Sequence, residues 1–242
     1  MTTFTHFDNN LRVAIIGASG GIGAALCDAL EDSDQVERLY PLSRRPIAGG
    51  IAINLDDEDS IASAAAEIGK DGALDLVINA TGLLHDDERG IAPEKTWRHL
   101  DPEVMMAVYR DNGIGPALVA KHFLPLMTKS RKSVFAALSA RVGSISDNRV
   151  GGWHSYRAAK AALNMLIRNF AIEMAYNSPQ AIVVGLHPGT VATALSAPFQ
   201  GMVQHDIFSP AEAAQHLLTV IDGLTPQDSG QQWAWDGTPI PG

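Results

Sequence analysis

Short apolar runs alternate along the chain with longer segments of helical periodicity, and this alternation constrains the fold more than any other feature of the sequence. The runs predict strands over 11–16, 36–42, 50–54, 74–79, 133–139, 181–186 and 231–235. Helical periodicity predicts helices over 22–30, 56–68, 95–109, 114–127, 156–175 and 210–221. Strands that alternate with helices are joined by crossover connections, which produce a mostly parallel sheet. The sequence therefore predicts an α/β fold, a doubly wound parallel sheet with helices on both faces.

The chain length and composition fit one such unit. The 242 residues are 46% hydrophobic and 19% charged, so a large core can be buried and global disorder is excluded. We find no internal repeat, low-complexity tract or linker-like shift in composition. We expect a single domain over 1–242, in which 190–208 lacks periodicity and is interpreted as a loop over the substrate.

Charge and cysteine content narrow the classes of partner. The net charge of −9 would repel the phosphates of nucleic acid and of anionic lipid, so we expect neither nucleic acid nor a membrane as partner. The single cysteine, Cys27, excludes an internal disulfide and is typical of a reducing compartment. The first ten residues lack the pattern of a secretory signal, and no apolar run approaches the length of about 20 residues that spans a bilayer. We expect a cytoplasmic protein.

A glycine cluster follows the first predicted strand and precedes the first predicted helix. A turn of this kind exposes backbone N–H groups at a helix N-terminus, which bind phosphate, and glycines let a pyrophosphate approach closely. The cluster thus predicts a dinucleotide site in a Rossmann fold. Two alternatives stay open: a glycine-rich turn without ligand, and a hydrolase nucleophile elbow (G-x-S-x-G) with Ser19 as nucleophile. The predicted cofactor contacts are Gly17, Ser19, Gly20, Gly21, Ile22 and Gly23.

Tyr156 and Lys160 are spaced Y-x-x-x-K, which places both side chains on one face of a helix, one turn apart. A phenol has a pKa of about 10, so it exchanges protons poorly at neutral pH. A neighbouring ammonium stabilises the phenolate and lowers that pKa. The spacing therefore predicts an acid–base pair, while on its own it is also compatible with a surface tyrosine and a solvated lysine.

Five motifs in order make the chain similar to the short-chain dehydrogenase/reductase family over almost its whole length. The glycine cluster resembles the family's T-G-x-x-x-G-x-G, with Ile16 in the place of the threonine. The other four are Asn79-Ala80-Thr81-Gly82 after the fourth strand, Asn112, the pair Tyr156 and Lys160, and the segment from His187 and Pro188 to Thr193. Finer features, such as the sequence from Ala140 to Ser146 and the terminal W-D-G-T-P-I-P, resemble the C-factor-like branch of small carbonyl reductases.

The resemblance implies a function and assigns roles to residues. It implies reversible hydride transfer between a nicotinamide and a carbonyl or secondary alcohol, with Tyr156 as the acid or base. It implies that Lys160 lowers the pKa of Tyr156 and holds the nicotinamide ribose, and that Asn112 anchors a proton-relay water. The remaining cofactor contacts that it implies are Asn79, Ala80, Thr81, Gly82, Pro188, Gly189, Val191 and Thr193.

The chain departs from the family pattern at the serine that orients the substrate carbonyl. The family has S-S-x-x-G after the fifth strand, and strict alignment puts Ala140 in the place of the second serine. Ser139 is the first candidate to replace it, and Ser144 the second. The alternative that no serine acts stays open.

The basic turn after the second strand bears on the choice of nicotinamide. An acidic residue at this position would bind the ribose 2′-hydroxyl of NAD, whereas Ser43, Arg44 and Arg45 suit a 2′-phosphate. We therefore expect NADP(H) to be preferred over NAD(H), with a solvated basic turn as the alternative. Asn54 and Leu55 lie where the family has an aspartate near the adenine.

The remaining predictions concern partners and competing functions. The histidines and the one cysteine show no metal-ligand spacing, so no metal is expected. Phe199, Met202 and Phe208 favour a hydrophobic carbonyl substrate. The resemblance implies a homodimer or homotetramer. Two alternatives from other classes remain: an NADP-binding sensor or signalling protein with weak or no catalysis, and the serine hydrolase that uses Ser19.

Overall fold

Eight strands form one mixed sheet in the computed structural model, which describes residues 3–45, 47–202 and 206–242. The strand order is β3-β2-β1-β4-β5-β6-β7-β8, and every neighbouring pair is parallel except β7 and β8. This confirms the predicted doubly wound sheet. The strands are β1 (Leu11–Ile16), β2 (Val36–Ser43), β3 (Ile51–Ala52), β4 (Leu76–Asn79), β5 (Ser133–Leu138), β6 (Ala181–His187), β7 (Gln232–Ala234) and β8 (Pro239–Ile240).

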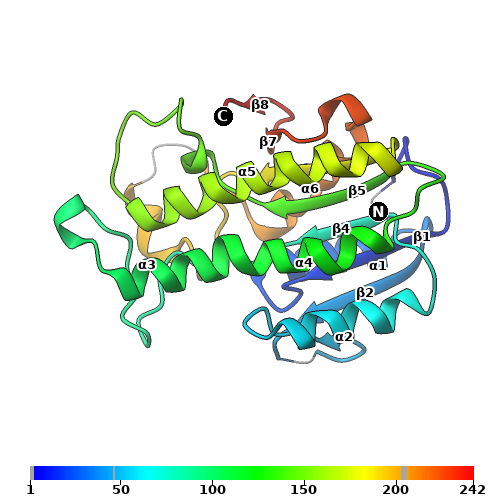
Figure 1. The fold of residues 1–242 in the computed structure, drawn as a ribbon, viewed down its shortest axis with the longest axis horizontal. Helices are drawn as coiled ribbons and strands as arrows, with labels where there is room; N and C mark the ends of the chain where they lie inside the picture. The colour runs from blue at the N-terminus through cyan, green and yellow to red at the C-terminus, as the bar shows by residue number, and fades with distance from the viewer. Residues whose placement is uncertain (1–2, 46, 203–205) are drawn as a thin grey trace.

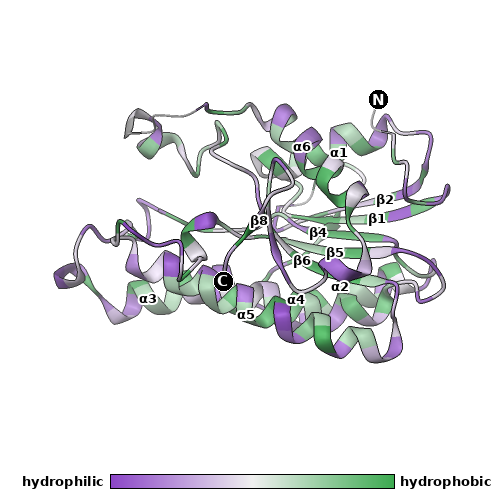
Figure 2. Cartoon of the chain, turned by 90° about the horizontal axis from the view of Figure 1, so that it is seen from above, coloured by the Kyte–Doolittle hydropathy of each residue, from purple (hydrophilic) through white to green (hydrophobic). Residues whose placement is uncertain are grey.

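Helices cover both faces of the sheet (Figure 1). Seen from above, α1 and α6 lie on one face and α2, α4 and α5 on the other (Figure 2). No helix among the described residues is long and apolar enough to cross a membrane. The α-helices are α1 (Gly21–Glu31), α2 (Glu58–Gly69), α3 (Pro102–Tyr109), α4 (Gly115–Phe123), α5 (His154–Asn177) and α6 (Pro210–Gly223).

The strands bury side chains on both faces, which explains why their sequences are continuously apolar. Along β1, Val13 and Ile15 pack against α1 and α6, while Ala14 and Ile16 pack against α2, α4 and α5. Burial of one such side chain contributes about 1.5–3 kcal/mol. The two cores together fix the helices relative to the carboxyl ends of the strands.

Local boundaries differ from the predictions for identifiable reasons. The helix expected over 95–109 begins only at Pro102, because the side chain of Asp101 caps the backbone N–H groups of Glu103 and Val104. A π-helical turn, Arg110–Ile114, joins α3 to α4. Strand β8 was not predicted at all, since a two-residue strand carries no periodicity.

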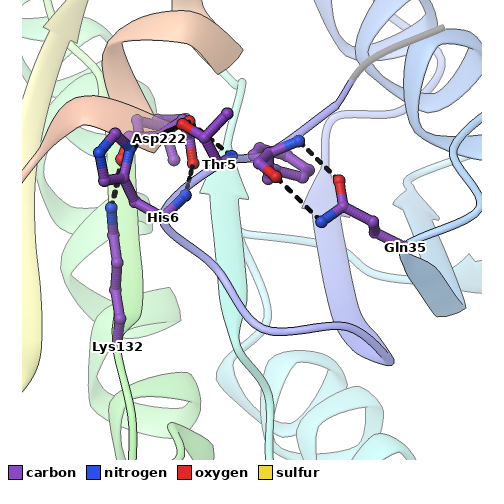
Figure 3. A network of polar contacts seen from close by, with 7 residues as sticks. Thr5, His6, Gln35, Lys132 and Asp222 are labelled. Atoms are coloured by element: carbon purple, nitrogen blue, oxygen red, sulfur yellow. Dashed lines mark hydrogen bonds and ion pairs between the residues drawn. The ribbon is translucent and has the colours of Figure 1, made fainter.

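Hydrogen bonds hold the N-terminal segment against the end of α6 (Figure 3). This contact lies at the edge formed by the amino ends of the strands, opposite to the edge of the predicted site. The carboxylate of Asp222 accepts hydrogen bonds from the backbone N–H groups of Thr5 and His6. The ammonium of Lys132 donates to the carbonyls of Ile221 and Asp222 at the end of α6, at 3.2 and 2.5 Å. The bonds from Lys132 thus add a cationic donor to carbonyls at the C-terminal end of the helix.

The topology places the predicted site at one edge of the sheet. From β1 the chain runs outward to β2 and β3, then returns and continues through β4 to β7 on the other side. Ligands of open parallel sheets bind at such a reversal, beyond the carboxyl ends of the strands. The segments that follow β1, β2, β4, β5 and β6 all meet there.

Helix α1 approaches β1 so closely that only glycine fits at position 23. A Cβ on Gly23 would lie 2.1 Å from the carbonyl oxygen of Gly17. Gly23→Ala should therefore lower the unfolding free energy by at least about 1–3 kcal/mol, although alanine normally stabilises a helix by up to about 1 kcal/mol over glycine. Thermal unfolding should show a fall of several degrees. Gly223→Ala at the end of α6 has no atom within 4 Å of its new Cβ and is the matched control. An unchanged midpoint for Gly23→Ala would contradict the contact.

Candidate active site

Two connected pockets run along the carboxyl edge of the sheet. The outer pocket has a volume of about 560 Å³ and the inner pocket about 280 Å³. They share Gly20, Ala80, Thr81 and Gly82, so they form one crevice. Predicted residues in the outer pocket are Gly17, Ser19, Gly20, Ser43, Arg44, Arg45, Asn54, Leu55, Ala80, Thr81 and Gly82. Those in the inner pocket are Gly20, Gly21, Ile22, Ala80, Thr81, Gly82, Ser139, Tyr156, Lys160, Pro188 and Thr193.

The glycine turn forms the wall between the two pockets. Gly17 has a φ of +90°, a conformation that L side chains rarely adopt, and its would-be Cβ lies 3.1 Å from the backbone of Ala80. Gly20 is the N-cap of α1 and offers no capping side chain, so the first N–H groups of the helix are not satisfied by a cap. A helix N-terminus of this kind attracts anions. The turn thus fits a pyrophosphate.

The basic turn after β2 lines the far end of the outer pocket. Ser43 is buried and its hydroxyl donates to the carbonyl of Arg45 at 2.5 Å. This bond shapes the turn, while both guanidinium groups stay exposed. Neither Arg44 nor Arg45 forms a salt bridge with a carboxylate among the described residues. Both cationic side chains therefore lie exposed at the pocket mouth, where the charge of Arg44 also acts on the carboxylate of Asp111.

Two asparagines hold the segment after β4 that separates the glycine turn from Tyr156. Asn79 accepts hydrogen bonds from the backbone and hydroxyl of Thr81. Asn112, fully buried in the π-helical turn, donates to the carbonyl of Leu83 at 2.7 Å and accepts from its N–H at 3.1 Å. Neither asparagine lines the outer or the inner pocket. Instead, Asn79 and Asn112 hold the backbone of the segment that contains Thr81 and Leu83, which lines the crevice.

Tyr156 and Lys160 are both buried in the wall of the inner pocket. The Lys160 ammonium lies 5.7 Å from the centre of the Tyr156 ring and donates to the carbonyl of Leu138 at 2.7 Å. Burial raises the pKa of Tyr156 and lowers the pKa of Lys160 to about 7. Burial thus favours the neutral form of each group in the protein alone. The expectation that a charged Lys160 favours the phenolate stays a prediction.

The two candidate serines occupy different environments. Ser139 lines the inner pocket with Tyr156, and its hydroxyl donates to the side chain of Asn164 at 2.7 Å. Ser144 lines neither pocket and accepts a hydrogen bond from the backbone of Asp147. Ala140 packs in the small apolar cluster that contains Tyr156. Of the two serines, Ser139 is the one that lines the inner pocket with Tyr156.

The segment after β6 contributes to the crevice through part of its length. Pro188 and Thr193 line the inner pocket, and the methyl group of Thr193 faces Gly21. Gly189 faces the rings of Phe208 and Trp235, outside the crevice. Val191 is buried and forms a parallel bridge with Phe208. The expected loop over 190–208 includes a 3-10 helix, Ala197–Met202; its residues 203–205 and the side chain of Met202 lie outside the described part of the chain.

Three aromatic side chains that the motifs did not identify as a group form a series of ring contacts that begins at Tyr156, next to the residues that line the inner pocket. The ring of Trp153 is 6.4 Å from that of Tyr156 and 5.2 Å from that of Phe199, measured between centroids. Phe199 also contacts His85 at 5.8 Å. We call Trp153, Phe199 and His85 the aromatic wall. Only Phe199 was expected to face substrate, because the other two belong to separate segments with no shared periodicity. Phe208, also expected there, instead packs against Trp235 and His216.

The fold defines an α/β protein whose crevice fits a dinucleotide and has Tyr156 and Lys160 in its inner half. The family model described as short chain dehydrogenase matches residues 12–203. The chain belongs to the short-chain dehydrogenase/reductase family, as its motifs predicted. It is an oxidoreductase whose family uses a nicotinamide cofactor.

Individual relatives agree with this assignment. The 1-hydroxy-2-glutathionyl-2-methyl-3-butene dehydrogenase of Rhodococcus sp. is 31% identical over 233 residues, which cover 93% of this chain and 97% of the relative. C-signal of Myxococcus xanthus is 34% identical over 175 residues, which cover 70% of this chain and 93% of the relative. The structure of NADPH-bound carbonyl reductase from chicken fatty liver superposes with a TM-score of 0.83 at 26% identity, covering 98% of this chain and 100% of that one.

These findings do not favour the two alternative functions. No described residue forms a hydrogen bond with the hydroxyl of Ser19, and that hydroxyl belongs to an exposed residue of the glycine turn. A hydrolase nucleophile needs a base within hydrogen-bond reach. The glycine turn, the crevice and the two exposed guanidinium groups fit a dinucleotide instead.

The lowered pKa of Lys160 predicts a pH dependence of stability. Above a pH of about 7 the folded protein releases a proton that the unfolded chain keeps up to its ordinary pKa of 10.5, so stability rises with pH in this window. The unfolding free energy of the wild type minus that of Lys160→Met should therefore rise by up to about 1.4 kcal/mol per pH unit. Urea unfolding at several pH values measures it. A flat difference would contradict a neutral buried lysine.

Proposed function

We propose that the chain is an NADP(H)-dependent carbonyl reductase that interconverts a hydrophobic carbonyl compound and its secondary alcohol. One observation carries the proposal: the crevice that ends at Arg44 and Arg45 opens at its other end onto Tyr156 and Lys160. When bound, the reduced nicotinamide supplies a hydride, that is, a hydrogen nucleus with two electrons, to the carbonyl carbon.

Tyr156 supplies the proton that completes the reduction. Burial raises its pKa, so the phenol is protonated at neutral pH and can donate its proton to the developing alkoxide. In the reverse direction the phenolate accepts the proton of the alcohol, so the same residue serves as the general base.

The neighbouring residues assist Tyr156. Lys160 has a pKa of about 7, so it can take up a proton near neutral pH and stabilise the phenolate that remains after transfer. The hydroxyl of Ser139 donates to Asn164 in the protein alone. When it donates to the substrate oxygen instead, it polarises the carbonyl. Asn112 keeps the opposite wall of the pocket in place, and the proton-relay water proposed for it would lie near Lys160.

The preference for NADP(H) is supported by charge and by one relative. Arg44 and Arg45 offer guanidinium groups, which bind phosphate through paired hydrogen bonds, at the end of the crevice remote from Tyr156. Ser43 shapes their turn, and Asn54 and Leu55 line the same pocket for the adenine. The chicken carbonyl reductase is described as bound to NADPH.

The aromatic wall supports a hydrophobic substrate. The ring of Trp153 contacts that of Tyr156, Phe199 contacts Trp153, and His85 contacts Phe199. Aromatic rings bind other rings and flat apolar groups favourably. We propose an aromatic or alicyclic carbonyl compound as the substrate class.

Assembly and location complete the proposal. Met165, Ile172 and Tyr176 are 63%, 46% and 82% exposed and lie on one face of α5. A homodimer or homotetramer that pairs through this helix would cover them. We further propose that the protein acts in the cytoplasm as a single NAD(P)-binding domain.

Tyr156→Phe tests the acid. The variant keeps the ring and removes only the hydroxyl, so carbonyl reduction should fall by about 10²–10⁴-fold in kcat. NADPH binding, followed by the fluorescence of the bound nicotinamide, should stay within about twofold, and Tyr109→Phe on α3 is the control at another tyrosine of the chain. Retained turnover in Tyr156→Phe would remove the role of this residue.

Arg44→Ala tests the cofactor preference. Loss of a charge-assisted contact to phosphate should raise KM for NADPH by about tenfold to a hundredfold and leave KM for NADH nearly unchanged. Arg38→Ala, which removes an exposed guanidinium over the ring of Tyr40 at 5.7 Å, controls for net charge. Equal effects on NADPH and NADH would show that Arg44 does not read the phosphate.

A further inference from the structure

A strained turn precedes the helix that carries Tyr156 and Lys160. Gly151, Gly152 and Trp153 have φ values of 68°, 65° and 50°, so three consecutive residues are left-handed. Glycine adopts this conformation freely, but a bulky residue such as tryptophan does so only when its surroundings enforce it. Trp153 is also the N-cap of α5 and has no side-chain oxygen to satisfy the first N–H groups of the helix.

Glu94 supplies the side-chain cap that Trp153 does not provide. Its carboxylate accepts hydrogen bonds from the backbone N–H of Ser155, at 3.1 Å, and from the hydroxyl of Ser155. Its own carbonyl accepts from the N–H of Trp153 at 2.6 Å. Glu94 is 5% exposed and lies 61 residues before Ser155 in the chain. A buried carboxylate is unfavourable unless it is fully hydrogen-bonded, and its negative charge is stabilised at a helix N-terminus.

The other α-helices with side-chain caps obtain them locally. Asp57, Asp101 and Ser209 cap α2, α3 and α6 from their own N-cap positions. Helix α5 has a tryptophan at that position, and the ring of this tryptophan lies between Tyr156 and Phe199 in the aromatic wall. The distant carboxylate therefore allows an aromatic side chain to stand where a polar cap would otherwise be needed.

We propose that Glu94 is a positioning residue: by capping α5 at Ser155 it holds Trp153 in its left-handed conformation and so fixes the aromatic wall beside Tyr156. The inference rests on the proposed carbonyl reduction and adds a specificity device to it. Glu94 acts on the substrate only through Trp153. Its removal should therefore affect aromatic carbonyls more than small aliphatic ones and should leave NADPH binding in place.

Kinetics of Glu94→Gln and Trp153→Leu, alone and combined, test this with benzaldehyde and propanal as substrates and NADPH as cofactor. Glu94→Gln should lower kcat/KM for benzaldehyde by about tenfold, lower that for propanal by less than about threefold, and change KM for NADPH by less than about twofold. In the Trp153→Leu background it should add less than about twofold, because the wall is already lost. Additive effects, or equal losses for both aldehydes, would overturn the proposal.

Glu212→Gln is the matched control. The Glu212 carboxylate accepts from the backbone N–H and the hydroxyl of Ser209, both at 2.8 Å, which is the same pair of donors at another helix start. It should change kcat/KM for either aldehyde by less than about twofold. A loss equal to that of Glu94→Gln would show a general effect on stability and overturn the proposal.

Amide hydrogen exchange gives a readout that needs no turnover. Glu94→Gln should speed exchange over residues 153–157 by about tenfold, whereas Glu212→Gln should do so only over 209–213. If the wild type reduced no carbonyl, the proposed function would fail while exchange still tested the cap. Unchanged exchange over 153–157 would overturn the role of Glu94.

Ser155→Ala keeps the test decisive if Glu94→Gln does not fold. It removes the hydroxyl donor and leaves the backbone bond, so the same pattern of aldehyde selectivity and exchange should appear at about a third of the size. No change in Ser155→Ala in either measurement would count against the proposal.

Discussion

A buried hydrogen bond from the Lys160 ammonium to the carbonyl of Leu138 joins helix α5 to the end of β5. A Cβ on Gly143 would lie 2.8 Å from that of Lys160, so the turn after β5 also packs directly on this lysine. The position of Tyr156, one helical turn away, follows from these contacts. The crevice is formed where α5 meets the strand ends. The shape of the inner pocket therefore depends on Lys160, whose side chain is buried.

Burial sets the chemistry of this pair in the protein alone. It favours the neutral phenol and the neutral amine, and it does so for both residues at once. Proton donation by the phenol then creates a charge that Lys160 can balance by taking up a proton. In the proposed reduction, the desolvated pocket strengthens the electrostatic interaction between the phenolate and the protonated amine.

Periodicity and the five motifs were sufficient to predict the sheet, its helices and most of the crevice, because apolar strands and glycine turns leave a local signal. Two features had none. Strand β8 has two residues, and the contact of Glu94 with Ser155 spans 61 residues, which no spacing reveals. The start of α3 did leave a local signal, because Asp101 and Pro102 are typical of an N-cap and a first helical residue. The placement of Ser139 and Ser144 also needed coordinates, since both lie near the same turn but, of the two, Ser139 lines the inner pocket.

The π-helical turn between α3 and α4 makes this part of the chain sensitive to length. It contains one residue more than a regular turn, and the N–H of Gly115 bonds to the carbonyl of Arg110. The extra residue directs the Asn112 side chain toward Leu83 while the apolar face of α4 still meets the sheet. Deleting one residue here would convert the π turn into a regular α-helical turn and remove the bulge that directs Asn112 toward Leu83. The wall of the crevice therefore depends on the number of residues in 110–114 as well as on their identity.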